Sequence, residues 1–136
     1  MQFKSSILGK LGVLLSTILL VVVSFTLSAS PAIAETYTVK MGTDRGRLMF
    51  DPRTLTVKPG DTIEWVMNQL GPHNVVFEQT PGNDAELAKS LSQEKLLFAV
   101  GESLTTTFPA DAPPGTYSFY CQPHQGVRMI GEITVE

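Results

Sequence analysis

The sequence predicts an all-β domain, an antiparallel sandwich or barrel of about eight short strands with one short helix inserted. After residue 34, short segments alternate apolar and polar side chains, which is the period of a half-buried strand. Turn signals rich in Pro, Gly and Asn separate these segments at fairly regular spacing. Only one segment has helical character, and no internal repeat or second domain is evident.

Each expected strand ends at a turn signal. Pro59-Gly60-Asp61 is a strong signal, and Ile63, Trp65 and Met67 share one face of the segment that follows it. Trp65 is the only tryptophan and is expected in the core. The expected strands are residues 37–41, 48–50, 55–58, 62–68, 74–77, 96–98, 103–108, 115–121 and 131–135.

Residues 84–91 are expected to form the helix. Asn83 or Asp84 is suited to cap its start, and an acidic residue stands in the first turn. Leu87 and Leu91 are four residues apart, so both are expected to face the sheet.

Residues 1–34 are interpreted as a cleaved signal peptide, and residues 35–136 as the single working domain. Lys4 and Lys10 precede an apolar run over residues 11–27, and a small-residue cleavage site follows this run. A membrane anchor is the alternative, because the run is nearly long enough to span a bilayer. The cleavage site favours the signal peptide, which implies that the protein is exported.

The charge of the expected domain is mildly acidic. Without Lys4 and Lys10, the ten Lys and Arg residues become eight, against thirteen Asp and Glu, so the net charge is about −5 with neutral histidines. Nucleic-acid binding needs a basic surface, so no nucleic-acid partner is expected.

The residues with the clearest chemistry lie near the C-terminus. Cys121 is the only cysteine, so it cannot form a disulfide within the chain. It stands in one short stretch with His124 and Met129, at the spacing Cys-x2-His-x4-Met. His73, the other histidine, lies far upstream beside Gly71-Pro72.

Strand alternation indicates where these donors point. Cys121 shares the core face of its segment with two bulky aromatic residues, and Met129 is in phase with the core face of the next strand. His124 projects from the loop between them. Neighbouring strands lie about 4.8 Å apart, so one ion is within reach of all three donors. His73 is expected to reach the same ion from another turn at that end of the sandwich.

The set of donors selects the metal. Each residue alone has an ordinary interpretation: an inert buried thiol, two turn histidines and a core methionine. A thioether is a poor ligand for zinc, calcium or magnesium. Two His and one Cys with a weak axial Met form the blue-copper electron-transfer site. The sequence therefore predicts a copper site made by His73, Cys121, His124 and Met129.

Two motifs make the chain similar to a known family. Pro72-His73-Asn74 together with Tyr120-Cys121-x-Pro123-His124-x-Gly126-x-x-Met129-x-Gly131 resembles the plastocyanins, which are small blue-copper cupredoxins. The resemblance covers essentially the whole of residues 35–136. It implies an eight-stranded Greek-key cupredoxin sandwich that holds one type 1 copper ion cycling between Cu(II) and Cu(I).

The resemblance also implies a function. The protein would be a monomeric electron carrier and not an enzyme, and would pass electrons from cytochrome f of the cytochrome b6f complex to photosystem I. Its place would be the thylakoid lumen, peripheral to the lumenal membrane face. The bacterial-type signal indicates a cyanobacterial version.

Partner contacts follow from the same resemblance. The family docks through an apolar face around the exposed histidine, which here is His124 with Gly46, Leu48, Gly71 and Pro72. Tyr120 points to the opposite face of its strand from Cys121 and matches the tyrosine of a second, side-on contact. Asn74 matches the residue that ties the upstream histidine to the cysteine strand.

The chain departs from the family pattern at two positions. The cyanobacterial loop usually reads Pro-His-Arg-Gly-Ala-Gly-Met, but here Gln125 replaces that arginine and Arg128 stands where a small residue precedes Met129. We hypothesise that Arg128 supplies the positive charge near the docking face. It would also be placed to crowd Met129 and alter the redox potential.

Three other functions stay open at this point. One is a periplasmic cupredoxin carrier with a different electron donor. Another is a copper-binding module without a redox role, which would favour several exposed Met or His ligands. The third is a hydrolase that pairs Cys121 with His124 or His73, which would leave Met129 unexplained.

Overall fold

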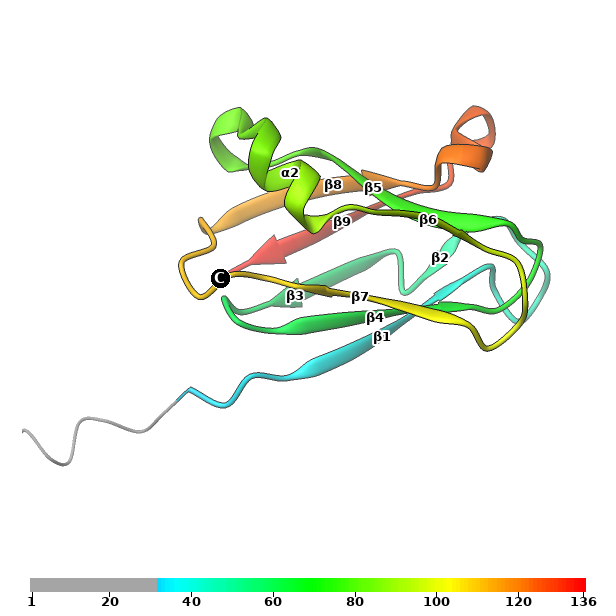
Figure 1. Ribbon diagram of the computed structural model, residues 1–136, viewed down its shortest axis with the longest axis horizontal. Helices are drawn as coiled ribbons and strands as arrows, with labels where there is room; N and C mark the ends of the chain where they lie inside the picture. Colours follow the sequence, from blue (N-terminus) through cyan, green and yellow to red (C-terminus); the bar gives the residue numbers. More distant parts are fainter. Residues whose placement is uncertain (1–31) are drawn as a thin grey trace, which may run out of the picture. The chain divides into compact units, whose positions relative to one another are not determined.

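The computed structural model describes residues 32–136, and Ala34–Glu136 forms one compact unit. Two sheets pack face to face, as Figure 1 shows. The four-stranded sheet contains, in spatial order, β2 (Phe50–Asp51), β1 (Thr36–Met41), β4 (Thr62–Met67) and β7 (Ser103–Thr107). The five-stranded sheet contains β3 (Thr54–Val57), β9 (Ile130–Val135), β8 (Gly115–Tyr120), β5 (His73–Gln79) and β6 (Gln93–Leu97). The predicted all-β sandwich is confirmed.

The strand pairing is mixed, whereas antiparallel sheets were predicted. β1 runs parallel to β4, with Thr36 opposite Thr62, and β3 runs parallel to β9, with Thr54 opposite Glu132. Alternation along a strand shows which side chains are buried but carries no information on the direction of the neighbouring strand. The prediction of purely antiparallel sheets was therefore wrong in these two pairings.

Aromatic side chains fill the space between the sheets. Trp65 is fully buried, as predicted, and its ring lies edge-on to Phe119 and Phe50, with centroids 4.9 and 5.9 Å away. The indole Nε1–H donates a 2.9 Å hydrogen bond to Thr106 Oγ1, so the buried polar atom has a partner. Such edge-to-face pairs add stability beyond the area that they bury.

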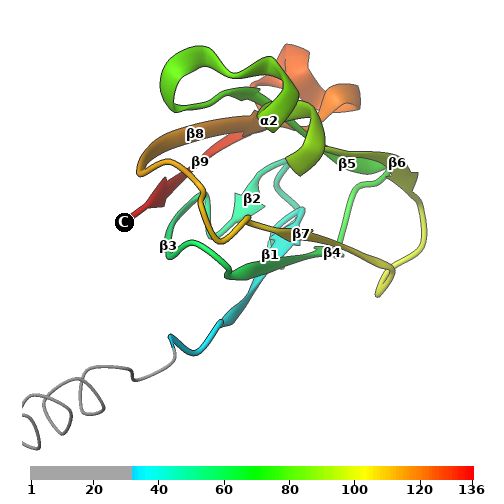
Figure 2. The ribbon, with the colours of Figure 1, turned by 60° about the vertical axis from the view of Figure 1, so that its left-hand side comes forward.

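The helix α2 (Ala85–Leu91) follows the 3₁₀ turn η1 (Pro81–Asn83) and packs on β5 (Figure 2). Asp84 is the capping residue, because its carboxylate accepts the Leu87 N–H at 3.0 Å. Leu91 is buried as predicted, whereas Leu87 is only partly buried.

The strand boundaries differ from those predicted by one or more residues, and three of these differences concern residues near the candidate site. Only Phe50 of residues 48–50 is paired, in the two-residue strand β2, and the rest belong to the loop after β1. Phe98 lies beyond the end of β6 and is exposed. His73 is the first residue of β5, although it was expected in a turn. In each case backbone pairing with a distant strand sets the boundary.

The predicted signal peptide falls mainly on residues 1–31, which lie outside the described residues. Within residues 32–136, no helix combines the length and apolar character needed to cross a membrane.

Candidate metal centre

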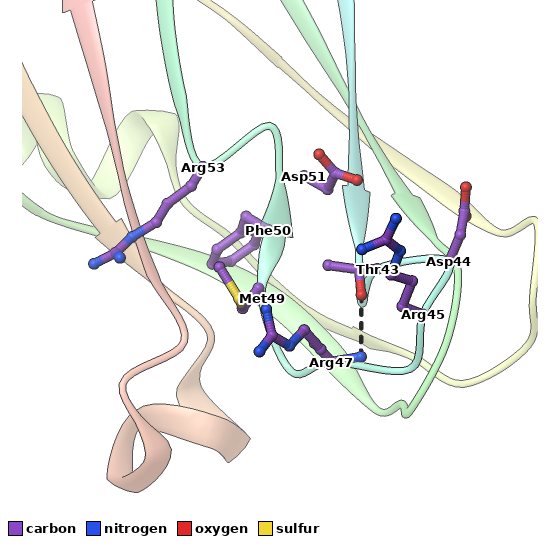
Figure 3. Close-up of a pocket in the computed structure, with 8 residues that line it drawn as sticks. All are labelled: Thr43, Asp44, Arg45, Arg47, Met49, Phe50, Asp51 and Arg53. Carbon is purple, nitrogen blue, oxygen red and sulfur yellow. Dashed lines mark hydrogen bonds between the residues drawn. The ribbon is translucent and has the colours of Figure 1, made fainter.

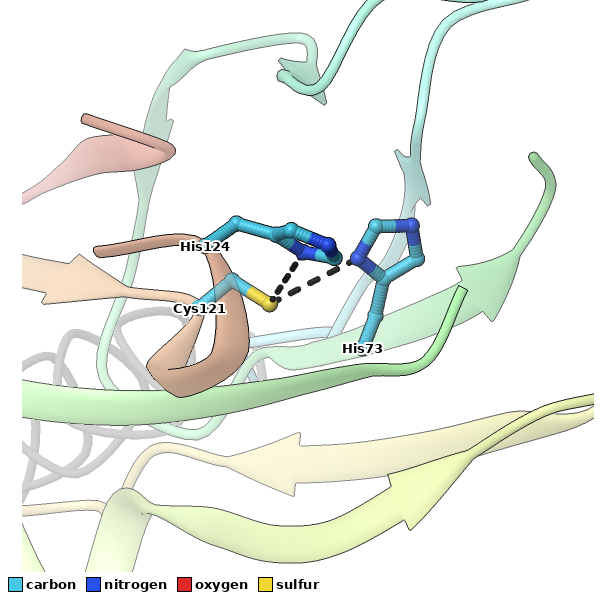
Figure 4. Close-up of side chains that lie close together, drawn as sticks. All are labelled: His73, Cys121 and His124. Atoms are coloured by element: carbon cyan, nitrogen blue, oxygen red, sulfur yellow. Dashed lines mark hydrogen bonds between the residues drawn. The ribbon is translucent and has the colours of Figure 1, made fainter. Parts of the chain in front are cut away.

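Three donor residues meet at one end of the sandwich (Figure 4). His73 opens β5, Cys121 directly follows β8, and His124 lies in the 3₁₀ segment η2 (Gln122–Val127). Backbone bonds close the loop: Cys121 N–H donates to Met129 O at 3.0 Å, and His124 N–H donates to Cys121 O at 3.1 Å. Met129 N–H in turn donates to His124 O at 3.2 Å. The loop is therefore held in shape by its own backbone.

The spacing of the donor atoms suits a single metal ion. Cys121 Sγ lies 3.5 Å from Nδ1 of His73 and 3.5 Å from Nδ1 of His124. The three ligand atoms all lie within 4.8 Å of one another. Donors held about 2.0–2.3 Å from a common tetrahedral centre lie about 3.5 Å apart. The donor set thus fits one ion, as the sequence predicted.

A contact with the backbone determines which ring nitrogen of His73 faces the metal site. The side chain is fully buried, and Nε2 lies 2.6 Å from Gln69 O. A carbonyl oxygen only accepts, so Nε2 carries the proton and Nδ1 keeps its lone pair toward Cys121. Burial lowers the pKa of His73, which favours this neutral form; the Gln69 contact raises the pKa and nearby His124 lowers it.

Cys121 is also fully buried. Burial raises the pKa of its thiol, while hydrogen bonds from the backbone of Asn74 and of His124 lower this pKa. A coordinated metal removes the proton from such a thiol outright, since the thiolate is the ligand. Because Cys121 is fully buried, its sulfur is poorly placed to attack an external substrate, and this argues against the hydrolase alternative.

The predicted alternation of core-facing and outward-facing side chains along β8 and Cys121 is confirmed. Tyr117, Phe119 and Cys121 are all buried, whereas Tyr120 is half-buried on the other face. Met129 is fully buried directly before β9. Its backbone bonds to Cys121 and His124 place it beside both donors.

Asn74 connects the two halves of the centre. Its Oδ1 accepts the Gln122 N–H at 2.9 Å, and its Nδ2 donates to Glu94 O at 3.1 Å and to Gln122 Oε1 at 3.2 Å. The side chain is fully buried with all these partners satisfied. The expected tie between the His73 segment and the Cys121 segment is therefore present.

Large apolar side chains are exposed in the loops at this end. Leu70 lies three residues before His73, Phe98 and Val100 lie between β6 and β7, and Val127 lies in η2. Phe98 and Val100 are 68% and 74% exposed. The sequence interpretation missed them because it assigned Phe98 to a strand. The signal was the apolar Phe98-Ala99-Val100 run directly before the Gly101 turn.

A family model described as copper binding proteins, plastocyanin/azurin family, matches residues 37–136. The chain belongs to this family. The resemblance inferred from the two motifs is confirmed, and the His73, Cys121 and His124 cluster of this cupredoxin suits one copper ion, with Met129 beside it.

Individual relatives agree with the family match. The chain is 55% identical to a plastocyanin of Nostoc punctiforme over 138 residues, covering 100% of this chain and 99% of the relative. It is 44% identical to a plastocyanin of Prochlorothrix hollandica over 136 residues, covering 100% of both chains. Among solved structures, oxidised plastocyanin from Dryopteris crassirhizoma superposes with a TM-score of 0.62 at 32% identity, covering 73% of this chain and 99% of that one. These likenesses and the donor cluster support a cupredoxin electron carrier.

Proposed function

We propose that this cupredoxin passes single electrons from cytochrome f of the cytochrome b6f complex to photosystem I. His73, Cys121, His124 and Met129 hold its type 1 copper ion. The observation that carries the proposal is the assembled donor set, in which the Cys121 thiol lies 3.5 Å from both imidazoles. When bound, copper supplies one-electron chemistry by alternating between Cu(II) and Cu(I).

The protein's contribution is rigidity. Fast electron transfer needs ligands that move little between the two redox states. Gln69 O fixes the His73 ring, and Asn74 joins the His73 strand to Gln122 beside Cys121. The backbone bonds around Met129 fix the rest of the loop. A buried Cys121 also keeps bulk water away from the sulfur.

Two routes connect the centre to partners. His124 is only partly buried, and Leu48 and Pro72, which the family resemblance assigns to the apolar docking face, are half-buried. An apolar face of this kind suits brief contacts with a partner. Tyr120 is the last residue of β8 and directly precedes Cys121, but its side chain lies on the opposite, half-buried face of the strand, which supports a second, side-on contact.

The proposal includes export. Residues 1–34 are the cleaved signal peptide, and residues 35–136 are the mature, monomeric domain in the thylakoid lumen. The full-length match to a plastocyanin of the Nostoc punctiforme strain supports this cellular setting. No enzymatic activity is proposed, because the donor cluster is used to hold the metal.

The first experiment is addition of Cu(II) to the purified protein. An intense blue colour that a mild reductant bleaches is expected, and Cys121→Ser should abolish it. Met129→Leu should retain copper but shift the spectrum and the redox potential. Met41→Leu is the matched control, because Met41 is an equally buried methionine in β1. A colourless protein whose thiol is freely alkylated would refute the copper site.

The second experiment addresses the partners. Stopped-flow reduction by the soluble domain of cytochrome f, and flash-induced oxidation by photosystem I, should both be fast. A blue, redox-active protein that exchanges electrons with neither partner would instead favour a cupredoxin carrier with a different donor.

A further inference from the structure

A groove of about 400 Å³ lies beside β2, on the edge of the four-stranded sheet (Figure 3). Arg45 and Arg47 come from the loop between β1 and β2, and Arg53 follows β2. We call this surface, defined by these three arginines, the arginine groove. All three side chains are exposed.

The three arginines are not used in ion pairs within the described part of the protein. Among residues 32–136, the one ion pair joins Lys40 and Asp44, so none of the three arginines pairs with a carboxylate there. Yet two carboxylates, Asp44 and Asp51, also line the groove. Which cation lies closest to each of these carboxylates therefore decides whether the arginines are free.

Lys40, and not an arginine, pairs with Asp44, the first of these two carboxylates. Its Nζ lies 2.8 and 2.9 Å from the two oxygens of Asp44, and Asn68 Nδ2 donates to Asp44 at 2.9 Å. The Lys40 bond, then the Asn68 bond, hold the pKa of Asp44 below its usual value. Lys40 is also directly opposite Asp51 in the β1–β2 pair. The guanidinium groups are left available to an outside partner.

The loop that presents Arg45 and Arg47 is rigid. Thr43 N–H donates to Arg47 O at 3.0 Å, Arg47 N–H donates to Thr43 Oγ1 at 3.1 Å, and Gly46 N–H donates to Thr43 O at 2.9 Å. Little conformational entropy is therefore lost by the loop backbone when a partner binds.

Hydrogen bonds of one residue, Gln69, join the loop that forms the groove to the metal centre. Gln69 Nε2 donates to Asp44 O at 3.1 Å, and Gln69 O accepts from His73 Nε2 at 2.6 Å. One residue thus bridges the arginine loop and a copper ligand. A protein that docks over the metal end would reach the arginine groove with its flank.

The groove also holds a large share of the positive charge of an otherwise acidic domain. Residues 35–136 contain eight Lys and Arg and thirteen Asp and Glu, and three of those eight cations line this one hollow. Charges on an edge strand also discourage sheet-to-sheet aggregation. That role does not need a hollow lined by three arginines, so it does not account for the whole arrangement.

We propose that the arginine groove binds a carboxylate-rich patch on the electron-transfer partner, flanking the contact at the metal end. This inference rests on the proposed function for the partner's identity. Guanidinium groups pair with carboxylates through two parallel hydrogen bonds, and charges at the rim of an interface act mainly on the association rate. The groove would therefore orient the partner and speed its arrival.

The first test is binding of a hexaglutamate peptide, followed by amide shifts in two-dimensional NMR. Shifts confined to residues 43–53 are expected, and the triple variant Arg45→Gln, Arg47→Gln, Arg53→Gln should lose them. The matched control is Lys58→Gln, Lys89→Gln, Lys95→Gln, which removes the same charge from elsewhere and should keep them. Shifts spread over the surface would overturn the proposal. So would equal shifts at the same amides with inorganic phosphate, which would indicate a small-anion site.

The second test is the rate of electron transfer from the soluble domain of cytochrome f at low ionic strength. The arginine variant should react about three- to tenfold more slowly, with a flatter salt dependence, while the lysine control stays within about twofold of the unmodified protein. Equal slowing of both variants would mean a net-charge effect only and would overturn the proposal. If the unmodified protein fails to react, the proposed function is refuted and the peptide experiment still decides the groove.

Discussion

Arg128 adopts a left-handed backbone conformation that residues other than glycine seldom adopt. It caps η2 in the left-handed conformation, with φ at +59°, and its N–H donates to Gln125 O at 2.9 Å. L-residues with a Cβ disfavour this conformation, so glycine would fit this position with less backbone strain. The exposed side chain leaves the guanidinium free to act as a charge at the metal end, as hypothesised from the sequence.

Arg128→Gly is expected to raise the free energy of unfolding by about 0.5–1 kcal/mol, because relief of backbone strain exceeds the entropy that glycine adds to the unfolded chain. Urea unfolding measures this. Arg128→Gln keeps the strain and should leave stability unchanged, but should slow the reaction with cytochrome f. Unchanged kinetics and salt dependence in Arg128→Gln would contradict the docking role.

Asn74→Ala should lower the free energy of unfolding by about 1–3 kcal/mol, since it removes a fully buried amide together with the part-buried hydrogen bonds that it makes with Gln122 N–H and Glu94 O. Urea unfolding of the metal-free protein isolates this effect from copper binding. Gln125→Ala in the same loop is the control, because that side chain is exposed. Equal losses in the two variants would show that the Asn74 bonds contribute nothing specific.

At the scale of elements, one carboxylate shapes the turn between β6 and β7. Glu102 Oε2 accepts the N–H groups of Phe98 at 3.0 Å and Ala99 at 2.9 Å. The Ala99 bond, then the Phe98 bond, lower the pKa of Glu102 from its usual 4.5. The turn that exposes Phe98 and Val100 beside the metal end is therefore ordered while Glu102 is ionised.

The pH dependence of this turn follows from the sign of that shift. A lowered pKa in the folded protein means that Glu102 stabilises the turn above its unfolded pKa and that this contribution is lost as pH falls through the folded value. The amide shifts of Phe98 and Ala99 should titrate with a midpoint below 4.5. Glu102→Gln should abolish that transition, and persistence of it in the variant would assign it to another group.

A second element-scale prediction concerns β9. A Cβ on Gly131 would collide with the Phe119 ring and with Arg53 O, where the chain before β3 comes close to β9. Gly131→Ala should therefore lower the free energy of unfolding by about 1–3 kcal/mol. In Gly126→Ala the new methyl group meets no atom within 4 Å, so its thermal midpoint should hardly change. If both variants unfold at the same temperature, the close approach of Phe119 and Arg53 does not restrict the residue at position 131 to glycine.

On the scale of the whole molecule, the metal centre closes one end of an already complete core. The aromatic cluster around Trp65 and the two sheets are held by side-chain packing and backbone pairing, neither of which needs a metal ion. The protein without metal should therefore keep its far-ultraviolet circular dichroism. Copper should raise the melting temperature, since a ligand at a hundred times its Kd adds about 2.7 kcal/mol to stability. Calorimetry with and without a chelator measures this, and loss of structure on chelation would contradict it.

Much of the fold and of the candidate site could be predicted from local patterns. Alternation placed Cys121 on the core side, and the Asp84 cap lay where the acidic helix start indicated. The spacing Cys-x2-His-x4-Met indicated three candidate donors, because ligand types and their separation along one loop are properties of the sequence itself. These features depend on residues close together in the chain.

Contacts between distant segments decided the rest. The parallel pairing of β1 with β4, the proton on His73 Nε2 and the gathering of three arginines around one hollow each join parts of the chain that no local pattern relates. The sequence by itself determined which side chains can bind copper. Only the tertiary structure decided which nitrogen of His73 faces the thiol and which charges stay free, because both depend on which backbone and side-chain groups packing brings within hydrogen-bonding distance.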